Sequence, residues 1–132
     1  KGSFIFTGDL MRAIPVSHTV EFLKASSYGA AAVSSGEVTI QQVGLDVVGK
    51  DVLVIEDIVD TGLTLQYIMR FLAGQKPASL RICTLLNKPT ARKVDVPIDY
   101  CGFTVPDVFV VGYGLDLDER YRHLPYIGIA PG

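Results

Sequence analysis

The segment Val52–Leu65, which reads VLVIEDIVDTGLTL, restricts the fold more than any other part of the chain. Within Asp51–Glu56, consecutive β-forming residues stand between polar ends, which predicts a strand buried on both faces of a parallel sheet. A short turn follows, and apolar residues then recur at helical spacing from Leu65 to Leu72, with Gly74 as the expected stop. A strand, a tight turn and a helix in this order form the repeating unit of an α/β fold.

The rest of the chain continues this alternation. Helices interleaved with apolar strands predict an α/β fold, with a mostly parallel twisted sheet flanked by helices and sites at the carboxyl ends of the strands. The other predicted elements are a helix over residues 4–14 that Pro15 ends, a half-buried strand at 16–22, and strands at 38–40, 80–86 and 109–111. The segment Ala25–Gly36 is small and polar and has neither period, so it is predicted to be a flexible loop.

Composition excludes several classes of protein. A chain of 132 residues with 48% apolar residues is typical of one soluble globular domain, and a net charge of −2 argues against a dedicated DNA-binding module. Cys83 and Cys101 stand alone, so neither a disulfide framework nor a zinc site is implied. Apolar runs stay below the roughly 18 residues of a membrane span, and the predicted compartment is the cytoplasm.

The turn after the central strand has the composition of a phosphate site. Backbone N–H groups at a helix N-terminus bind anions, Gly62 permits close approach, and Thr61 and Thr64 supply hydroxyls. It is not a Walker loop, because the GxxxxGK[ST] pattern is absent and Leu63 stands where a basic residue would be expected.

Three carboxylates, those of Glu56, Asp57 and Asp60, stand beside this turn. They would repel a phosphate unless they face sugar hydroxyls, a divalent metal ion or a proton that has to be removed. The alternative is that they only cap the helix N-terminus, where carboxylates are stabilising. Three such residues together at the end of a buried strand favour the chemical interpretation.

Glu56–Thr64 resembles the phosphoribosyl-pyrophosphate signature of type I phosphoribosyltransferases, and the remainder resembles the hypoxanthine-guanine phosphoribosyltransferases of bacterial type. The matching blocks, in the family's order, are Lys1-Gly2, Ser26–Gly29, Glu56–Thr64, Leu85–Pro89 and Pro106–Arg122. The resemblance covers essentially the whole chain. It implies purine salvage, in which the 5-phosphoribosyl group passes from phosphoribosyl pyrophosphate to N9 of hypoxanthine or guanine, giving IMP or GMP and pyrophosphate.

The resemblance also assigns roles in the turn. Glu56 and Asp57 would bind the ribose hydroxyls, and Asp60 would act as general acid/base at N7 of the purine. The 5′-phosphate would be held by Thr61, Gly62, Leu63 and Thr64. The side chain at Leu63 is tolerable, because a backbone amide needs no particular side chain.

Further roles fall near the C-terminus. Lys88 would select 6-oxopurines, since an ammonium group has donors only. Phe109 would stack on the purine, and the main chain at Val110 would read its edge. Asp116 would contribute to the purine site and hold a second Mg²⁺ shared with pyrophosphate, which Arg122 would contact. Without the resemblance, these residues would be a solvated lysine, core packing and a solvated charged turn.

Two more blocks complete the implied site. Lys1 and Gly2 match a pyrophosphate-binding loop, and Ser27 and Tyr28 match the start of a lid that keeps water from the reacting centre. The implied cofactor is Mg²⁺. Its protein ligands would be Glu56, Asp57 and Asp116.

The expected organisation is a single phosphoribosyltransferase domain over residues 1–132 with a small C-terminal hood. The family's N-terminal helix and strand are expected to be missing, which would expose strand edges and part of the core. Two alternatives stay open: a nucleotide-sensing regulator on the same fold, and an inactive fragment of the enzyme. The expected partners are the small-molecule substrates and further copies in a homodimer or homotetramer, without nucleic acid or membrane. The choice among hypoxanthine, guanine and xanthine is also open.

Overall fold

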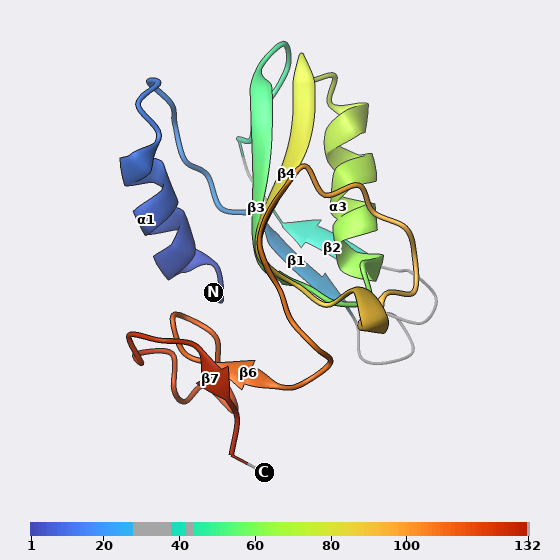
Figure 1. Cartoon of the computed structure of the whole chain (residues 1–132). Coiled ribbons are helices and arrows are strands. Elements are labelled where there is room, and N and C mark those ends of the chain that lie inside the picture. The colour runs from blue at the N-terminus through green and yellow to red at the C-terminus, as the bar shows by residue number, and fades with distance from the viewer. Residues whose placement is uncertain (28–37, 42–43, 132) are drawn as a thin grey trace.

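The computed structural model describes residues 1–27, 38–41 and 44–131 (Figure 1). Its elements, in chain order, are α1 (Phe4–Ala13), β1 (Lys24–Ser27), β2 (Val38–Gln41), β3 (Asp51–Val59), α3 (Leu63–Gly74), β4 (Ser79–Asn87), the 3₁₀ turn η1 (Pro89–Ala91), β5 (Tyr100–Thr104), β6 (Val110–Val111) and β7 (Gly128–Ile129).

The main sheet has three parallel strands in the order β3-β4-β5. The α/β prediction with a parallel sheet is therefore confirmed, although β5 was not predicted because its residues are all exposed and lack an apolar run. In the ladder, Val59 at the end of β3 pairs with Asn87 at the end of β4. The carboxyl ends of both strands consequently open onto the same edge of the sheet.

The strand β3 lies at an edge of this sheet, and the prediction that it is buried on both faces is wrong. Asp51 and Leu53 are exposed, and its central residues are only half-buried. Within the described ranges, β3 pairs only with β4, so its other side is not covered by a strand. Burial on two faces requires elements packed along the whole of both faces, and the exposure of Asp51 and Leu53 shows that this cover is incomplete at the start of β3.

The helix α3 forms where the 3.6-residue period predicts it, and it supplies the core. Its apolar face buries Leu65, Ile68 and Leu72. Leu65 joins Val59 and Ile82 in one buried cluster. Because the residues on either side of the Asp60–Gly62 turn are packed into this cluster, the turn is held at both ends.

The helix predicted over residues 4–14 is confirmed as α1, which ends one residue before Ile14. In Figure 1 it lies on the far side of β3 from α3. The half-buried strand predicted over Val16–Phe22 is wrong: these residues are irregular, and Val16 and Phe22 are exposed. An alternating pattern becomes a strand only where a partner accepts its hydrogen bonds, and the described residues provide none here.

The predicted loop over Ala25–Gly36 begins later than expected. Residues up to Ser27 belong to β1, which pairs antiparallel with β2 through Ser27 and Val38. The strand predicted at Val38–Ile40 is confirmed as β2. Residues 28–37, which include Tyr28 and most of the predicted lid, lie outside the described residues.

The C-terminal part is built from short ladders rather than from the main sheet. The apolar run Phe109–Val111 was expected to be a buried strand, but β6 spans only Val110–Val111 and pairs antiparallel with β7. Phe109 is 56% exposed. Across the described residues, the structure has no helix long and apolar enough to cross a membrane.

Candidate active site

The turn between β3 and α3 has the backbone geometry of an anion site. Gly62 is the N-cap of α3 and adopts a left-handed conformation with φ 84°, which glycine tolerates best. Its carbonyl accepts from the Gln66 amide at 2.9 Å, so the helix ladder starts at once. Leu63 N–H donates to Thr61 Oγ1 at 3.4 Å, and among the described contacts the amides of Gly62 and Thr64 have no acceptor. The turn thus presents N–H donors at the positive end of a helix.

The carboxylates beside the turn do not cap α3. Among the described contacts, the side-chain bond to the start of this helix comes from the Thr61 hydroxyl, and none comes from Glu56, Asp57 or Asp60. The Asp57 carboxylate accepts from the next amide, that of Ile58, at 2.8 Å, and Asp60 likewise accepts from Thr61 at 2.7 Å. The interpretation that these carboxylates only cap the helix N-terminus is therefore wrong, because none of them accepts a hydrogen bond from an amide of α3 in the described contacts. These local bonds orient Asp57 and Asp60 and leave most of their acceptor capacity for a ligand.

Glu56 and Asp57 form an acidic pair whose pKa values are raised, so that ionising them is unfavourable. Burial, and next the negative charge of Asp57, raise the pKa of Glu56 from 4.5 to about 7. Burial also raises the pKa of Asp57, against the opposing effect of its hydrogen bond from Ile58. Groups that are costly to ionise in the free protein are stabilised by a ligand that brings hydroxyl donors or positive charge.

The start of the chain lies directly against this acidic pair. A Cβ atom added at Gly2 would collide with the Asp57 carboxylate, and one added at Gly114 would lie 2.8 Å from the Gly2 carbonyl oxygen. Lys1-Gly2 therefore sits between the end of β3 and the loop that follows β6. Only residues without side chains permit this approach.

A charged network occupies the loop after β6. Arg122 donates to the Gly114 carbonyl at 2.7 Å and to Glu119 at 3.1 Å, and it lies 3.4 Å from Asp116. Glu119 also lies 3.8 Å from Lys1 Nζ. Arg122 is close enough to lower the pKa of Asp57. The structure therefore brings the predicted pyrophosphate residues and the predicted ribose residues together.

The predicted purine residues come from two other places. Lys88 follows β4, and its amide donates to the Val59 carbonyl at 2.9 Å, so it stands at the end of β3 beside the acidic turn. Phe109 precedes β6 and is held by a hydrogen bond from the Ala130 amide to its carbonyl at 2.8 Å. Since the Phe109 ring is exposed, core packing does not explain it, and its face is available for stacking.

The residues present fit a metal ion that the substrate shares. Among the described residues, no group of three or more His, Cys, Asp and Glu side chains could hold a metal by itself. Mg²⁺ commonly binds through one or two carboxylates together with waters and substrate phosphates. The acidic pair Glu56–Asp57 and the carboxylate of Asp116 match that sparse pattern, and not an all-protein cage.

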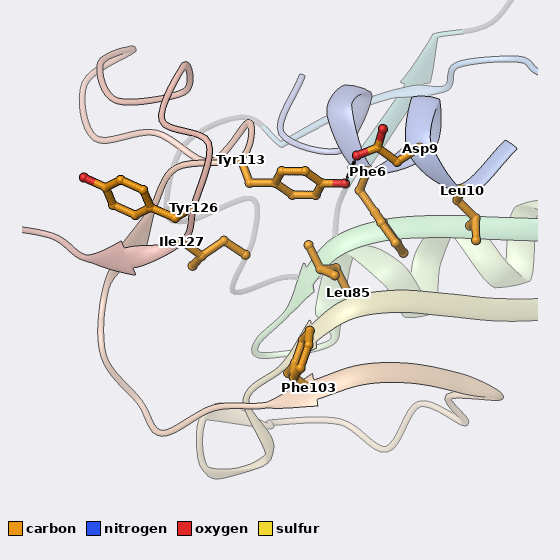
Figure 2. A pocket seen from close by; sticks show the side chains of 8 residues that line it. All are labelled: Phe6, Asp9, Leu10, Leu85, Phe103, Tyr113, Tyr126 and Ile127. Carbon is orange, nitrogen blue, oxygen red and sulfur yellow. Dashed lines mark hydrogen bonds between the residues drawn. The ribbon is translucent and has the colours of Figure 1, made fainter. Parts of the chain in front are cut away.

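A separate cavity of about 500 Å³ lies between α1, the ends of β4 and β5, and the C-terminal loops. Figure 2 shows its largely aromatic and aliphatic lining, with the Tyr113 hydroxyl donating to Asp9 at one side. That hydrogen bond lowers the pKa of Asp9 and raises that of Tyr113. None of the sequence-predicted site residues lines this cavity, which is therefore distinct from the acidic turn.

Sequence reasoning missed two contributors to the site. Gly114 allows the approach of Gly2, and Arg92 donates to the Asp60 carbonyl at 2.9 Å. Arg92 lies just beyond the matching block Leu85–Pro89, so its nearness to that block was the available signal.

A family model described as "Phosphoribosyl transferase domain" matches residues 1–118, and the match includes the parallel sheet and its acidic, glycine-capped turn. This match gives the class of protein. Within that class, the chain belongs to the hypoxanthine-guanine phosphoribosyltransferase family, as its similarity to individual members shows.

Hypoxanthine phosphoribosyltransferase of Escherichia coli is 52% identical over 129 residues, covering 97% of this chain and 72% of the relative. Hypoxanthine-guanine phosphoribosyltransferase of Mycobacterium avium is 55% identical over 129 residues, and the chain spans 64% of its length. A crystal structure of a hypoxanthine-guanine phosphoribosyltransferase from Bacillus anthracis superposes with a TM-score of 0.94 at 45% identity, covering 99% of this chain and 78% of that chain.

Proposed function

We propose that this chain transfers the 5-phosphoribosyl group from phosphoribosyl pyrophosphate to N9 of hypoxanthine or guanine. The products are IMP or GMP and pyrophosphate, and the reaction belongs to purine salvage. One observation carries the proposal. The acidic pair Glu56–Asp57, which is costly to ionise, lies in the last four residues of β3, shortly before the amide donors of the Gly62 turn, and Asp57 lies against Gly2. A ribose bearing a 5′-phosphate and a pyrophosphate matches these three neighbouring features.

The turn binds the sugar phosphate. Glu56 and Asp57 accept hydrogen bonds from the ribose hydroxyls, which relieves the cost of ionising them. The 5′-phosphate is held by donors of the turn residues Thr61, Gly62, Leu63 and Thr64. Asp60 is exposed and is oriented by the Thr61 amide, so it can exchange a proton with N7 of the purine.

The purine and the pyrophosphate lie on either side of the reacting ribose carbon. Lys88 donates to the 6-oxo group, Phe109 stacks on the ring, and the main chain of Val110 reads the base edge. The leaving pyrophosphate is bound by the backbone of Lys1-Gly2 and by the guanidinium of Arg122. This arrangement contributes proximity and charge stabilisation at the transition state.

A bound Mg²⁺ would supply positive charge against the negative charge that develops on the leaving pyrophosphate. Glu56, Asp57 and Asp116 are the carboxylates that would face it. The lid that would include Ser27 and Tyr28, and assembly into a homodimer or homotetramer, remain predictions.

Ultraviolet monitoring of nucleotide formation with hypoxanthine, guanine and xanthine in turn tests the function. We expect turnover with at least one 6-oxopurine, none with adenine, and loss of turnover in excess chelator. A protein that melts cooperatively, gains stability with phosphoribosyl pyrophosphate and Mg²⁺, and yet forms no nucleotide would contradict the proposal and favour the inactive fragment. Salt-sensitive RNA binding without turnover would instead favour the regulator.

A further inference from the structure

The segment 92–94, which follows η1, packs against the turn on the side away from the proposed ligand, and we call this segment the clasp. The amides of Lys93 and Val94 both donate to the Thr61 carbonyl, at 2.9 and 3.3 Å. Gly62 is buried beneath the same segment: a Cβ atom added there would lie 3.1 Å from Arg92 Cδ and 3.1 Å from the Val94 carbonyl oxygen. The outer side of the turn is therefore closed by residues that sequence reasoning did not assign to the site.

Arg92 makes the most specific contacts of this clasp. Its Nε donates to the Asp60 carbonyl at 2.9 Å, and its Nη2 donates to the Asn87 side-chain oxygen. Asn87 ends β4 and pairs with Val59, which ends β3. One planar guanidinium thus ties the first carbonyl of the turn to the end of the neighbouring strand. Among the described residues, no carboxylate lies within ion-pair distance of Arg92, so its role here is to donate to the turn and not to neutralise an acid.

The clasp fixes the direction in which the turn's amides point. In a trans peptide, the C=O and the following N–H point in opposite directions. The Thr61 carbonyl is held by the clasp, so the amide of Gly62 in the same peptide faces away from it, toward the ligand side. The Asp60 carbonyl accepts from Arg92, and the Thr61 amide of the same peptide donates to the Asp60 carboxylate at 2.7 Å.

We propose that Arg92 is a positioning residue for the phosphoribosyl transfer: by fixing the Asp60–Thr61 peptide, it orients the Asp60 carboxylate and holds in place the start of the turn from which the Gly62 amide projects. This inference rests on the proposed function. It requires the fork geometry of a guanidinium, because two donors in one plane must reach a carbonyl and an amide oxygen at once. A lysine could supply the charge, but its three N–H donors sit on one nitrogen and lack the two separate nitrogens of the fork.

The test compares Arg92→Met, Arg92→Lys and the control Arg70→Met in steady-state kinetics with both substrates varied. Arg70 is an exposed residue of α3, and it is not among the side chains that form ion pairs in the described residues. For Arg92→Met we expect KM for phosphoribosyl pyrophosphate to rise about tenfold, because a displaced turn would lose about one of its own hydrogen bonds to the 5′-phosphate. We expect kcat to fall about 10- to 100-fold through misplacement of Asp60, and KM for the purine to stay within about twofold.

Arg92→Lys is expected to remain impaired in both quantities, and Arg70→Met to behave as wild type. Full rescue by Arg92→Lys would show that only charge matters, and an equal rise in both KM values would show general loosening. Either result would overturn the inference.

A binding measurement separates this inference from the function on which it rests. Titration of ribose 5-phosphate into wild type and each variant needs no turnover, and it is run below the melting temperature of every variant. We expect Arg92→Met and Arg92→Lys to bind about tenfold more weakly than wild type. Absence of turnover in a wild type that binds ribose 5-phosphate would contradict the proposed function alone. Equal affinity in all variants would contradict the role of Arg92 alone.

Discussion

The β3–α3 turn and the loop after β6 both supply site residues, but they are built in opposite ways. The turn takes its chemistry from consecutive residues between a strand and a helix that share one buried cluster. The loop has two-residue ladders and isolated bridges, and four of its non-glycine residues adopt positive φ, namely Tyr113, Asp118, Glu119 and Tyr121. In this loop Asp118, Glu119 and Arg120 are exposed, whereas Glu56 and Asp57 beside the turn are half-buried.

The charged groups of the two regions also differ in whether a partner already neutralises them. In the turn, burial raises the pKa of Glu56 to about 7, so the protein stores electrostatic cost that a ligand can release. In the loop, Arg122 is satisfied by Asp116 and Glu119, and a ligand has to compete with them. We therefore expect substitutions in the turn to produce large and salt-insensitive effects, and substitutions in the loop to produce small and salt-sensitive ones.

The largest effect is expected for Asp60→Asn. The substitution keeps the shape of the turn and an acceptor for the Thr61 amide, but it removes the basic group. Turnover should fall by about 10²–10⁴, the usual range for a positioned acid/base group. Affinity for phosphoribosyl pyrophosphate should stay the same or improve slightly, because a negative charge near its phosphate is lost. Steady-state kinetics together with titration of the substrate measure both.

The matched control for this variant is Asp95→Asn, an exposed position directly after the clasp on the same turn. It should retain wild-type turnover and affinity. If Asp60→Asn keeps turnover within about threefold, Asp60 is a structural residue of the turn and the general acid/base role is wrong.

The same contrast explains what could be predicted from the sequence. The strand, turn and helix around Glu56–Leu65 were predictable, because local periodicity and a glycine at the helix start determine them. The arrangement of Lys1-Gly2 between Asp57 and Gly114 was not, since it depends on contacts between segments far apart in the chain. The family resemblance supplied those residues, but their contacts had to come from the structure. The strand predicted at Val16–Phe22 failed for a related reason: a period says nothing about whether a pairing partner is present.

The next effect concerns stability and pH. The pKa of Glu56 is raised from 4.5 to about 7, so its contribution to stability is full below pH 4.5 and is lost as the pH rises through about 7. Ionising it in the folded protein costs up to about 3 kcal/mol at pH 8. Glu56→Gln should therefore flatten the stability curve over this window and be more stable than wild type at pH 8. Urea unfolding across the pH range measures this.

A control in the same experiment is Glu21→Gln, an exposed position for which we expect an unchanged pH dependence. Unfolding curves of Glu56→Gln and wild type that run parallel from pH 4.5 to 8 would show that Glu56 is not costly to ionise. The proposed reason for its affinity toward a ligand would then be wrong.

Lys88→Ala is expected to have an intermediate effect, because Lys88 stands beside the turn but is proposed to face only the purine. Loss of one charge-assisted hydrogen bond should cost about 1.5–3 kcal/mol in 6-oxopurine use. Affinity for phosphoribosyl pyrophosphate should change far less. Comparison of KM and kcat/KM for both substrates tests this, with the exposed Lys93→Ala as control. Equal losses for both ligands would show that Lys88 does not read the base.

The smallest effect is expected in the loop, for Glu119→Gln. Glu119 accepts from Arg122 at 3.1 Å and lies 3.8 Å from Lys1 Nζ, so it occupies the guanidinium proposed to bind pyrophosphate and the ammonium group beside that site. Exposed ion pairs of this kind contribute about 0–1 kcal/mol, and removing the competing carboxylate should tighten pyrophosphate binding by at most about fivefold. The gain should appear at low ionic strength and shrink when salt screens the loop.

The control for charge alone is Asp118→Asn. Asp118 is an exposed neighbour with φ 52°, a conformation that asparagine tolerates. Titration of pyrophosphate with Mg²⁺ at two salt concentrations decides between the outcomes. Weaker binding by Glu119→Gln would mean that Glu119 orients Arg122 for the ligand and does not compete with it, and the loop would then be preorganised in the same sense as the turn.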